Sequence, residues 1–183
     1  AQLMETETRT DDVTKLTPRI AETARLIGGL YIALTAAAAA ILFALGLSGL
    51  APRMTLYNAV AHAFTSISTA GFSPEAQSIG AFEPIVQWVV IPLMFVGATN
   101  FVILYRLTQG DTRRLRNSEE FRFYLGILLG ASALVATFLF VDDQFAGVEP
   151  VLRHALFQTV SIVTTTGYAT VDFDLWSPGA KHL

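Results

Sequence analysis

The chain has 183 residues, of which 52% are hydrophobic and only 15% are charged, with a formal net charge of −3 and no cysteine. Soluble domains usually carry about 25% charged residues, so the composition favours a protein of the lipid bilayer. A net negative charge argues against nucleic-acid binding, which needs a basic face. A sequence without cysteine excludes disulfides, thiolate metal sites and cysteine nucleophiles.

Residues 1–20 are polar and mixed in charge, without the short apolar region and cleavage site of a signal peptide. We expect residues 1–25 to form a cytoplasmic arm or a linker between membrane spans. An uncharged run of 27 residues then lies between Arg25 and Arg53. Because a spanning helix needs roughly 20 apolar residues, residues 26–50 predict a first span.

A second uncharged stretch, residues 54–74, differs from the first because it is rich in polar side chains. These are Asn58, His62, Thr65, Ser66, Ser68, Thr69 and Ser73. Its helix-compatible part, residues 55–68, is too short to cross a bilayer, and its polar groups need shelter from lipid. We therefore predict a half-helix that enters the membrane and an extended segment that returns.

The remaining hydrophobic segments set the expected topology. Residues 80–107 predict a second span, interrupted by Pro92, and residues 123–141 predict a third. The polar loop between them contains Arg113, Arg114 and Arg116, and such an excess of arginine marks the cytoplasmic side. The third span then runs outward and leads to a second half-helix at about residues 151–163.

Both half-helices end in similar phrases, FTSISTAGF at residues 64–72 and VSIVTTTGY at residues 160–168, offset by 96 residues. Rings of backbone carbonyls can replace the water shell of a potassium ion. Such a loop needs positive φ angles, which glycine adopts at little steric cost, and the partly negative end of the half-helix favours a cation. The repeat therefore predicts an ion filter.

The candidate residues follow from the aligned phrases. Potassium ligands are expected among Ser68, Thr69, Ala70, Gly71 and Phe72 of the first copy and Thr164, Thr165, Thr166, Gly167 and Tyr168 of the second. Acidic side chains at the outer mouth can concentrate cations. Asp172 is the best single candidate among Asp142, Asp143, Glu149, Asp172 and Asp174, most of which are otherwise expected at a solvated surface.

The two phrases, together with GATNF at residues 97–101, resemble the pore loops and an inner helix of the Trk/Ktr/HKT superfamily of potassium transporters, particularly its TrkH-like branch. The resemblance implies an all-α membrane protein with helix–pore-loop–helix units in a pseudo-fourfold arrangement, similar to the pore of voltage-gated channels. Residues 26–107 would form a complete unit, residues 108–120 a cytoplasmic loop, and residues 121–183 part of the next unit, so the ring is incomplete here.

The resemblance also implies a function and partners. It implies potassium uptake across the cell membrane by a multi-pass protein that is not an enzyme, with potassium as substrate and no bound cofactor. Glycine rather than serine in the filter implies a preference for potassium over sodium. The remaining pore units, membrane lipid, a second copy in a homodimer and a cytoplasmic nucleotide-binding regulatory subunit are the partners that it implies.

Several alternatives remain open at the level of sequence. A potassium channel with tandem pore loops is the nearest rival, and an intramembrane hydrolase is a remote one because the chain has no Gly-x-Ser-x-Gly elbow. His62 and His154 are expected to form hydrogen bonds behind the filter rather than a metal site. Asn100, a polar residue in a span, is expected to line the pore or to bond a neighbouring helix.

Overall fold

The computed structural model describes residues 9–108 and 118–172, and within these ranges the chain forms helices and no strand. The all-α prediction is confirmed. In chain order the elements are α2 (Arg9–Leu47), α3 (Leu56–Ile67), the 3-10 helix η1 (Ser78–Ala81), α4 (Pro84–Gly97), α5 (Phe101–Thr108), α7 (Glu119–Val141) and α8 (Val148–Val163).

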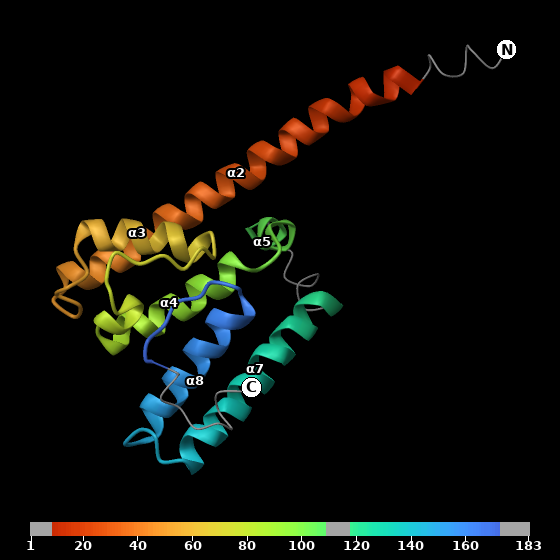
Figure 1. Cartoon of the computed structure of the whole chain (residues 1–183). Coiled ribbons are helices and arrows are strands. Elements are labelled where there is room, and N and C mark those ends of the chain that lie inside the picture. Colours follow the sequence, from red (N-terminus) through yellow and green to blue (C-terminus); the bar gives the residue numbers. More distant parts are fainter. Residues whose placement is uncertain (1–8, 109–117, 173–183) are drawn as a thin grey trace.

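Two of these helices contain segments long and apolar enough to cross a membrane, Ala21–Leu47 with 27 residues and Glu119–Val141 with 23 residues. They coincide with the first and third predicted spans. Helix α2 begins at Arg9, inside the stretch expected as an arm, and its N-terminal half projects beyond the other helices (Figure 1). The arm and the first span are therefore continuous as one helix from Arg9 onward.

The second predicted span is not a single helix. Pro92, the expected interruption, lies inside α4, which continues to Gly97. The break falls instead at residues 98–100, between α4 and α5. At this point α4 meets the end of α3, and a Cβ atom added to Gly97 would lie 2.7 Å from the carbonyl oxygen of Ile67. Helix α4 therefore ends where its backbone at Gly97 meets the backbone of α3, and not at Pro92.

The predicted half-helices are present. Helix α3 lies between Thr55, whose hydroxyl accepts the amide hydrogen of Asn58 at 3.2 Å, and Ser68, its C-terminal cap. A hydroxyl at this position satisfies an amide that the first turn leaves without a partner. Helix α8 also ends where predicted, at Val163, but begins earlier than predicted, after Gly147.

The largest buried hydrophobic cluster contains residues from both predicted units. Helix α3 packs on α2 and α4, α7 packs on α8, and α8 packs on α4 across the boundary between the units (Figure 1). Val86 and Val90 of α4 lie in the same buried cluster as Phe157 and Val160 of α8. Each such side chain contributes about 1.5–3 kcal/mol when fully buried. The boundary between the units is thus part of the core, which fixes the two half-helices relative to each other.

The contact at Gly97 gives a test of this packing. We expect Gly97→Ala to lower the free energy of unfolding by about 1–3 kcal/mol, as for other overpacked sites, because the added methyl group would meet the backbone of Ser66 and Ile67. Thermal unfolding in detergent measures the effect. Gly130→Ala is the matched control, since a Cβ atom at Gly130 in α7 has no neighbour within 4 Å. Equal stability of Gly97→Ala and the control would contradict the close crossing.

Candidate functional site

The loops that follow α3 and α8 have the same alternation of backbone torsions. Ser68 and Thr164, which cap the two helices, have φ of −80° and −81°. The positive φ angles then recur at equivalent positions, at Thr69 (51°) and Gly71 (69°) in the first loop and at Thr165 (58°) and Gly167 (86°) in the second. Two threonines therefore adopt a conformation that L residues avoid, which indicates that the surroundings of both loops impose it.

The amide hydrogens of the first loop return to the end of α3. Thr69 donates to the carbonyl oxygen of Ser66 at 3.2 Å. Ala70 and Gly71 both donate to the carbonyl oxygen of Thr65, at 2.9 and 3.3 Å. These bonds use carbonyl groups that the last turn of a helix leaves without partners, so the loop acts as the cap of its own half-helix.

The second loop makes the equivalent bonds to α8. Thr165 donates to the carbonyl oxygen of Ile162 at 2.9 Å. Thr166 and Gly167 donate to the carbonyl oxygen of Ser161, at 2.9 and 3.2 Å. Every partner is displaced by the 96 residues that separate the two phrases. The sequence repeat is therefore also a repeat of backbone geometry.

These bonds determine where the carbonyl groups point. In a trans peptide unit, the C=O of one residue points opposite to the N–H of the next. Because the amides of residues 69–71 and 165–167 point back at the helix ends, the carbonyls of residues 68–70 and 164–166 point away from them. Three successive oxygens thus project from each loop on the side away from its helix, as coordination of a dehydrated cation requires.

Side chains brace the first loop from behind. The Nδ1 atom of buried His62 donates to the carbonyl oxygen of Asn58 at 2.7 Å, so its Nε2 atom accepts from the Ser73 hydroxyl at 2.9 Å. The Asn58 amide donates to Glu75 Oε1 at 3.0 Å. The hydrogen-bonding role expected for His62 is confirmed. Among the described residues, no group of three His, Cys, Asp or Glu side chains could hold a metal ion.

The second loop is held by a different set of side chains. The Ser161 hydroxyl donates to the carbonyl oxygen of Tyr168 at 2.7 Å. Thr164 Oγ1 lies 2.7 Å from Thr166 Oγ1. His154 Nδ1 lies 2.8 Å from Thr170 Oγ1, just beyond the loop, which confirms the hydrogen-bonding role expected for this histidine too. The backbone is repeated, but its supports are specific to each copy.

Tyr168 connects the second loop to the first half-helix. Its side chain is 1% exposed, and its hydroxyl contacts Thr65 Oγ1 and lies 3.4 Å from Ser66 Oγ. Thr65 already donates to Ala61 at 2.9 Å, so its oxygen accepts the tyrosine hydrogen. Phe72, the equivalent aromatic residue of the first loop, is 77% exposed. The aromatic side chain of one unit therefore inserts behind the loop of the unit before it.

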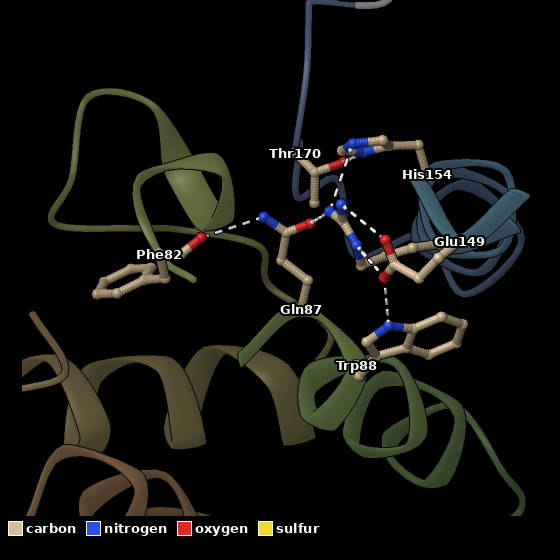
Figure 2. Close-up of polar contacts among 7 residues, drawn as sticks. Phe82, Gln87, Trp88, Glu149, His154 and Thr170 are labelled. Carbon is tan, nitrogen blue, oxygen red and sulfur yellow. Dashed lines mark hydrogen bonds and ion pairs between the residues drawn. The ribbon is translucent and has the colours of Figure 1, made fainter. Parts of the chain in front are cut away.

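A buried arginine that the sequence reasoning missed lies near the N-terminal end of α8. Arg153 is 6% exposed, and its Nε atom donates to Glu149 Oε1 at 2.8 Å. The same carboxylate accepts from Trp88 Nε1 of α4 at 2.9 Å, and Gln87 Oε1 accepts from Arg153 Nη1 (Figure 2). The bonds from Arg153 and Trp88 hold the pKa of Glu149 below its usual value. The available signal was a single arginine in the predicted half-helix at residues 151–163, which contains no lysine, aspartate or glutamate.

Two polar candidates from the sequence line cavities. Asp172 is exposed at the end of the described chain and borders a cavity of about 450 Å³ together with Gln77, Ser78, Gly80, Ala169 and Thr170. Asn100 borders a smaller cavity of about 150 Å³ at the break between α4 and α5, together with Glu120 and Tyr124. Asp174 and the loop arginines Arg113, Arg114 and Arg116 lie outside the described residues.

Comparison with known proteins identifies the relatives. Residues 1–143 match the family model TrkH, described as a cation transport protein. The chain is 32% identical over 170 residues to the Trk system potassium uptake protein TrkH of Halomonas elongata, which covers 91% of this chain and 33% of that protein. It is 29% identical over 164 residues to the protein of the same name from Salmonella typhimurium, covering 88% of this chain and 32% of the relative.

A solved structure gives the same result. The crystal structure of the potassium transporter TrkH from Vibrio parahaemolyticus matches with a TM-score of 0.78 and 30% identity, covering 87% of this chain and 34% of that one. These matches define the class as cation transport proteins of the membrane. Within this class, the chain belongs to the TrkH family. It spans about a third of the length of the relatives that it matches.

The family confirms the expected resemblance and the membrane localisation, and a family of transporters is consistent with a chain that is not an enzyme. The alternatives that the sequence left open, a channel with tandem pore loops and an intramembrane hydrolase, gain no support from these matches.

The tyrosine bridge between the units can be tested by removing one atom. Tyr168→Phe should lower the free energy of unfolding by about 1–2 kcal/mol, because it removes the hydroxyl that bonds Thr65 and Ser66 while keeping the buried ring. Tyr57→Phe is the matched control, since Tyr57 is 71% exposed. Unfolding midpoints in detergent measure both variants, and equal midpoints for the two would show that the hydroxyl contributes nothing.

Proposed function

We propose that the chain forms two of the pore-lining units of a potassium uptake protein, and that potassium ions pass along the carbonyl oxygens of its two loops. The observation that carries the proposal is the repeated set of amide bonds, which turns the carbonyls of residues 68–70 and 164–166 away from the half-helices. Rings of such carbonyls can replace the hydration shell of potassium. The relatives are potassium uptake proteins by name, which supports this choice of ion.

The proposed ion-binding residues are those of the two loops. They are Ser68, Thr69, Ala70, Gly71 and Phe72, and Thr164, Thr165, Thr166, Gly167 and Tyr168. Backbone carbonyls supply the ligands, the glycines permit the torsions, and Tyr168 anchors its loop from behind. Asp172 is proposed at the outer mouth, where its charge raises the local concentration of cations. Potassium is the proposed substrate, and the proposed activity needs no cofactor or catalytic residue.

We further propose that the complete pore contains additional units of the same kind. Tyr168 is 1% exposed because it packs behind the loop of the first unit, whereas Phe72 is 77% exposed. Phe64 and Val160, which begin the two repeated phrases, differ in the same way: Val160 is 1% exposed and Phe64 is 54% exposed. The second unit therefore buries these two positions against the first unit, whereas the first unit leaves its own two positions exposed. A preceding unit would cover Phe64 and Phe72 in the way that the first unit covers Val160 and Tyr168.

The proposed organisation of the chain follows this repeat. Residues 26–107 form one complete unit and residues 121–183 part of the next, with a linking arm at residues 1–25 and a cytoplasmic loop at residues 108–120. Membrane lipid and the other pore units are the immediate partners. A homodimer and a cytoplasmic nucleotide-binding regulatory subunit are further proposed partners, and the arginine-rich loop between the units is a suitable contact for the latter.

The central variants are Gly71→Ser and Gly167→Ser in the full-length protein. Each glycine has a positive φ angle, where an L side chain costs about 1–2 kcal/mol. Relief of this strain would rotate the neighbouring carbonyls away from the ion. We expect the selectivity for potassium over sodium to fall about tenfold, the factor that corresponds to about 1.4 kcal/mol. Competitive uptake of rubidium and sodium measures the ratio.

Gly49→Ser is the matched control. Gly49 has a comparable φ of 76° but lies in the turn after α2, and a Cβ atom there has no neighbour within 4 Å. Its substitution introduces the same backbone strain away from the loops and should leave the ion preference unchanged. An unchanged potassium preference in both loop variants, or an equal loss in the control, would refute the assignment of the filter.

A further inference from the structure

Arg153 lies where a charged side chain is costly. Its side chain is 8% exposed, and a guanidinium withdrawn from water is tolerated only when its charge and its donors are matched. The equivalent residue of the first unit is Tyr57, which is 71% exposed. The arginine therefore belongs to the second unit alone, and the symmetry of the repeat does not account for it.

The donors of Arg153 join α8 to α4. The Nε and Nη2 atoms lie 2.8 and 3.5 Å from the two oxygens of Glu149. Nη1 donates to Gln87 Oε1 of α4, and the Gln87 amide donates onward to the carbonyl oxygen of Phe82 at 3.2 Å. Figure 2 shows Gln87 and Trp88 facing Glu149 and His154 across this boundary. The positive charge is thus balanced by one carboxylate on its own helix.

The same guanidinium faces His154. Nη1 of Arg153 lies 3.4 Å from His154 Nε2. A guanidinium only donates hydrogen bonds, so the nitrogen that faces it carries no proton. The proton of the neutral ring then lies on Nδ1, 2.8 Å from Thr170 Oγ1. Thr170 is the second residue after Tyr168, so this histidine reaches the chain directly beyond the second loop.

We propose that Arg153 is a positioning residue for the second loop, which joins the outer end of α8 to α4 and, together with the burial of the ring, keeps His154 uncharged as it holds Thr170. The inference rests on the proposed function. Burial is the main cause that lowers the pKa of His154, and within the described residues the charged groups that act on it are Arg153 and Glu149, both on α8. From other parts of the chain it meets Phe145, stacked at 4.6 Å between ring centroids, and Thr170, both of which are neutral.

Removal of the guanidinium should therefore expose the titration of His154. In Arg153→Gln, the glutamine keeps a donor for its neighbours, while Glu149 remains ionised and favours the imidazolium. Protonation of His154 then adds a positive charge beside the outer end of the loop. We expect this like charge to weaken cation binding by a factor of about three. Burial of the ring still lowers the pKa of His154 in this variant, so the step should lie between the wild-type value of about 4 and the ordinary imidazole pKa of about 6.5.

The experiment measures KM and maximal rate of potassium uptake by the full-length protein in vesicles, at external pH values lowered in steps from about 7.5 to about 5, because the buried imidazole titrates below its ordinary pKa. In Arg153→Gln the KM for potassium should rise as the pH falls, by up to about threefold over its own value at pH about 7.5, whereas the KM of the wild type should stay constant. Arg153→Lys keeps the charge and should behave as the wild type. In Arg153→Gln/His154→Asn the asparagine amide can still reach Thr170 but does not titrate, so the rise should disappear.

Two further variants keep the test decisive. Glu149→Gln leaves the arginine uncompensated and should raise KM at all of these pH values, even where Arg153→Gln fails to reach the membrane. Arg53→Gln removes an exposed arginine bonded to Ala81 at 3.1 Å and should add no pH dependence. A flat KM in Arg153→Gln, persistence of the rise without His154, or an unchanged KM in Glu149→Gln would overturn the inference. A wild type that takes up no potassium would instead refute the proposed function.

Discussion

The amide hydrogens of the two loops return to the carbonyl groups at the ends of α3 and α8, and the rest of the arrangement depends on this. Each peptide unit that gives its N–H to the helix must direct its C=O the other way. The backbone meets this constraint through positive φ angles at alternate residues, which are Thr69 and Gly71 in the first loop and Thr165 and Gly167 in the second. The helix also brings its negative end to the loop, so one set of bonds both shapes the loop and makes its position favourable for a cation.

The two copies use the same backbone but different side chains. His62 and Asn58 support the first loop through Ser73 and Glu75, whereas the second depends on Ser161 and on the histidine next to Arg153. Four identical subunits would impose one solution on every loop. Units joined in one chain can each be braced by different neighbours. The difference between the exposed Phe72 and the buried Tyr168 is therefore the basis for proposing a further unit that covers Phe72.

Local patterns predicted the elements well. Polar residues in a short uncharged stretch located α3, and the hydroxyl–glycine–aromatic phrase located both loops, because these features depend on neighbours in sequence. The break at residues 98–100 was missed because it coincides with the approach of α4 to the carbonyls of Ser66 and Ile67. The bonds from Arg153 to Gln87 and from Tyr168 to Thr65 join residues 66 and 103 positions apart. No local pattern contains such pairs.

The central claim is that the two loops present their carbonyl oxygens to the same potassium ions. Anomalous diffraction from crystals of the full-length protein grown with rubidium tests it most directly, since rubidium replaces potassium and can be located by its scattering. We expect peaks on the side of the loops to which the carbonyls of residues 68–70 and 164–166 point, within coordination distance of both loops. Peaks confined to the region of Asp172, or well-ordered loops without a peak between them, would contradict it.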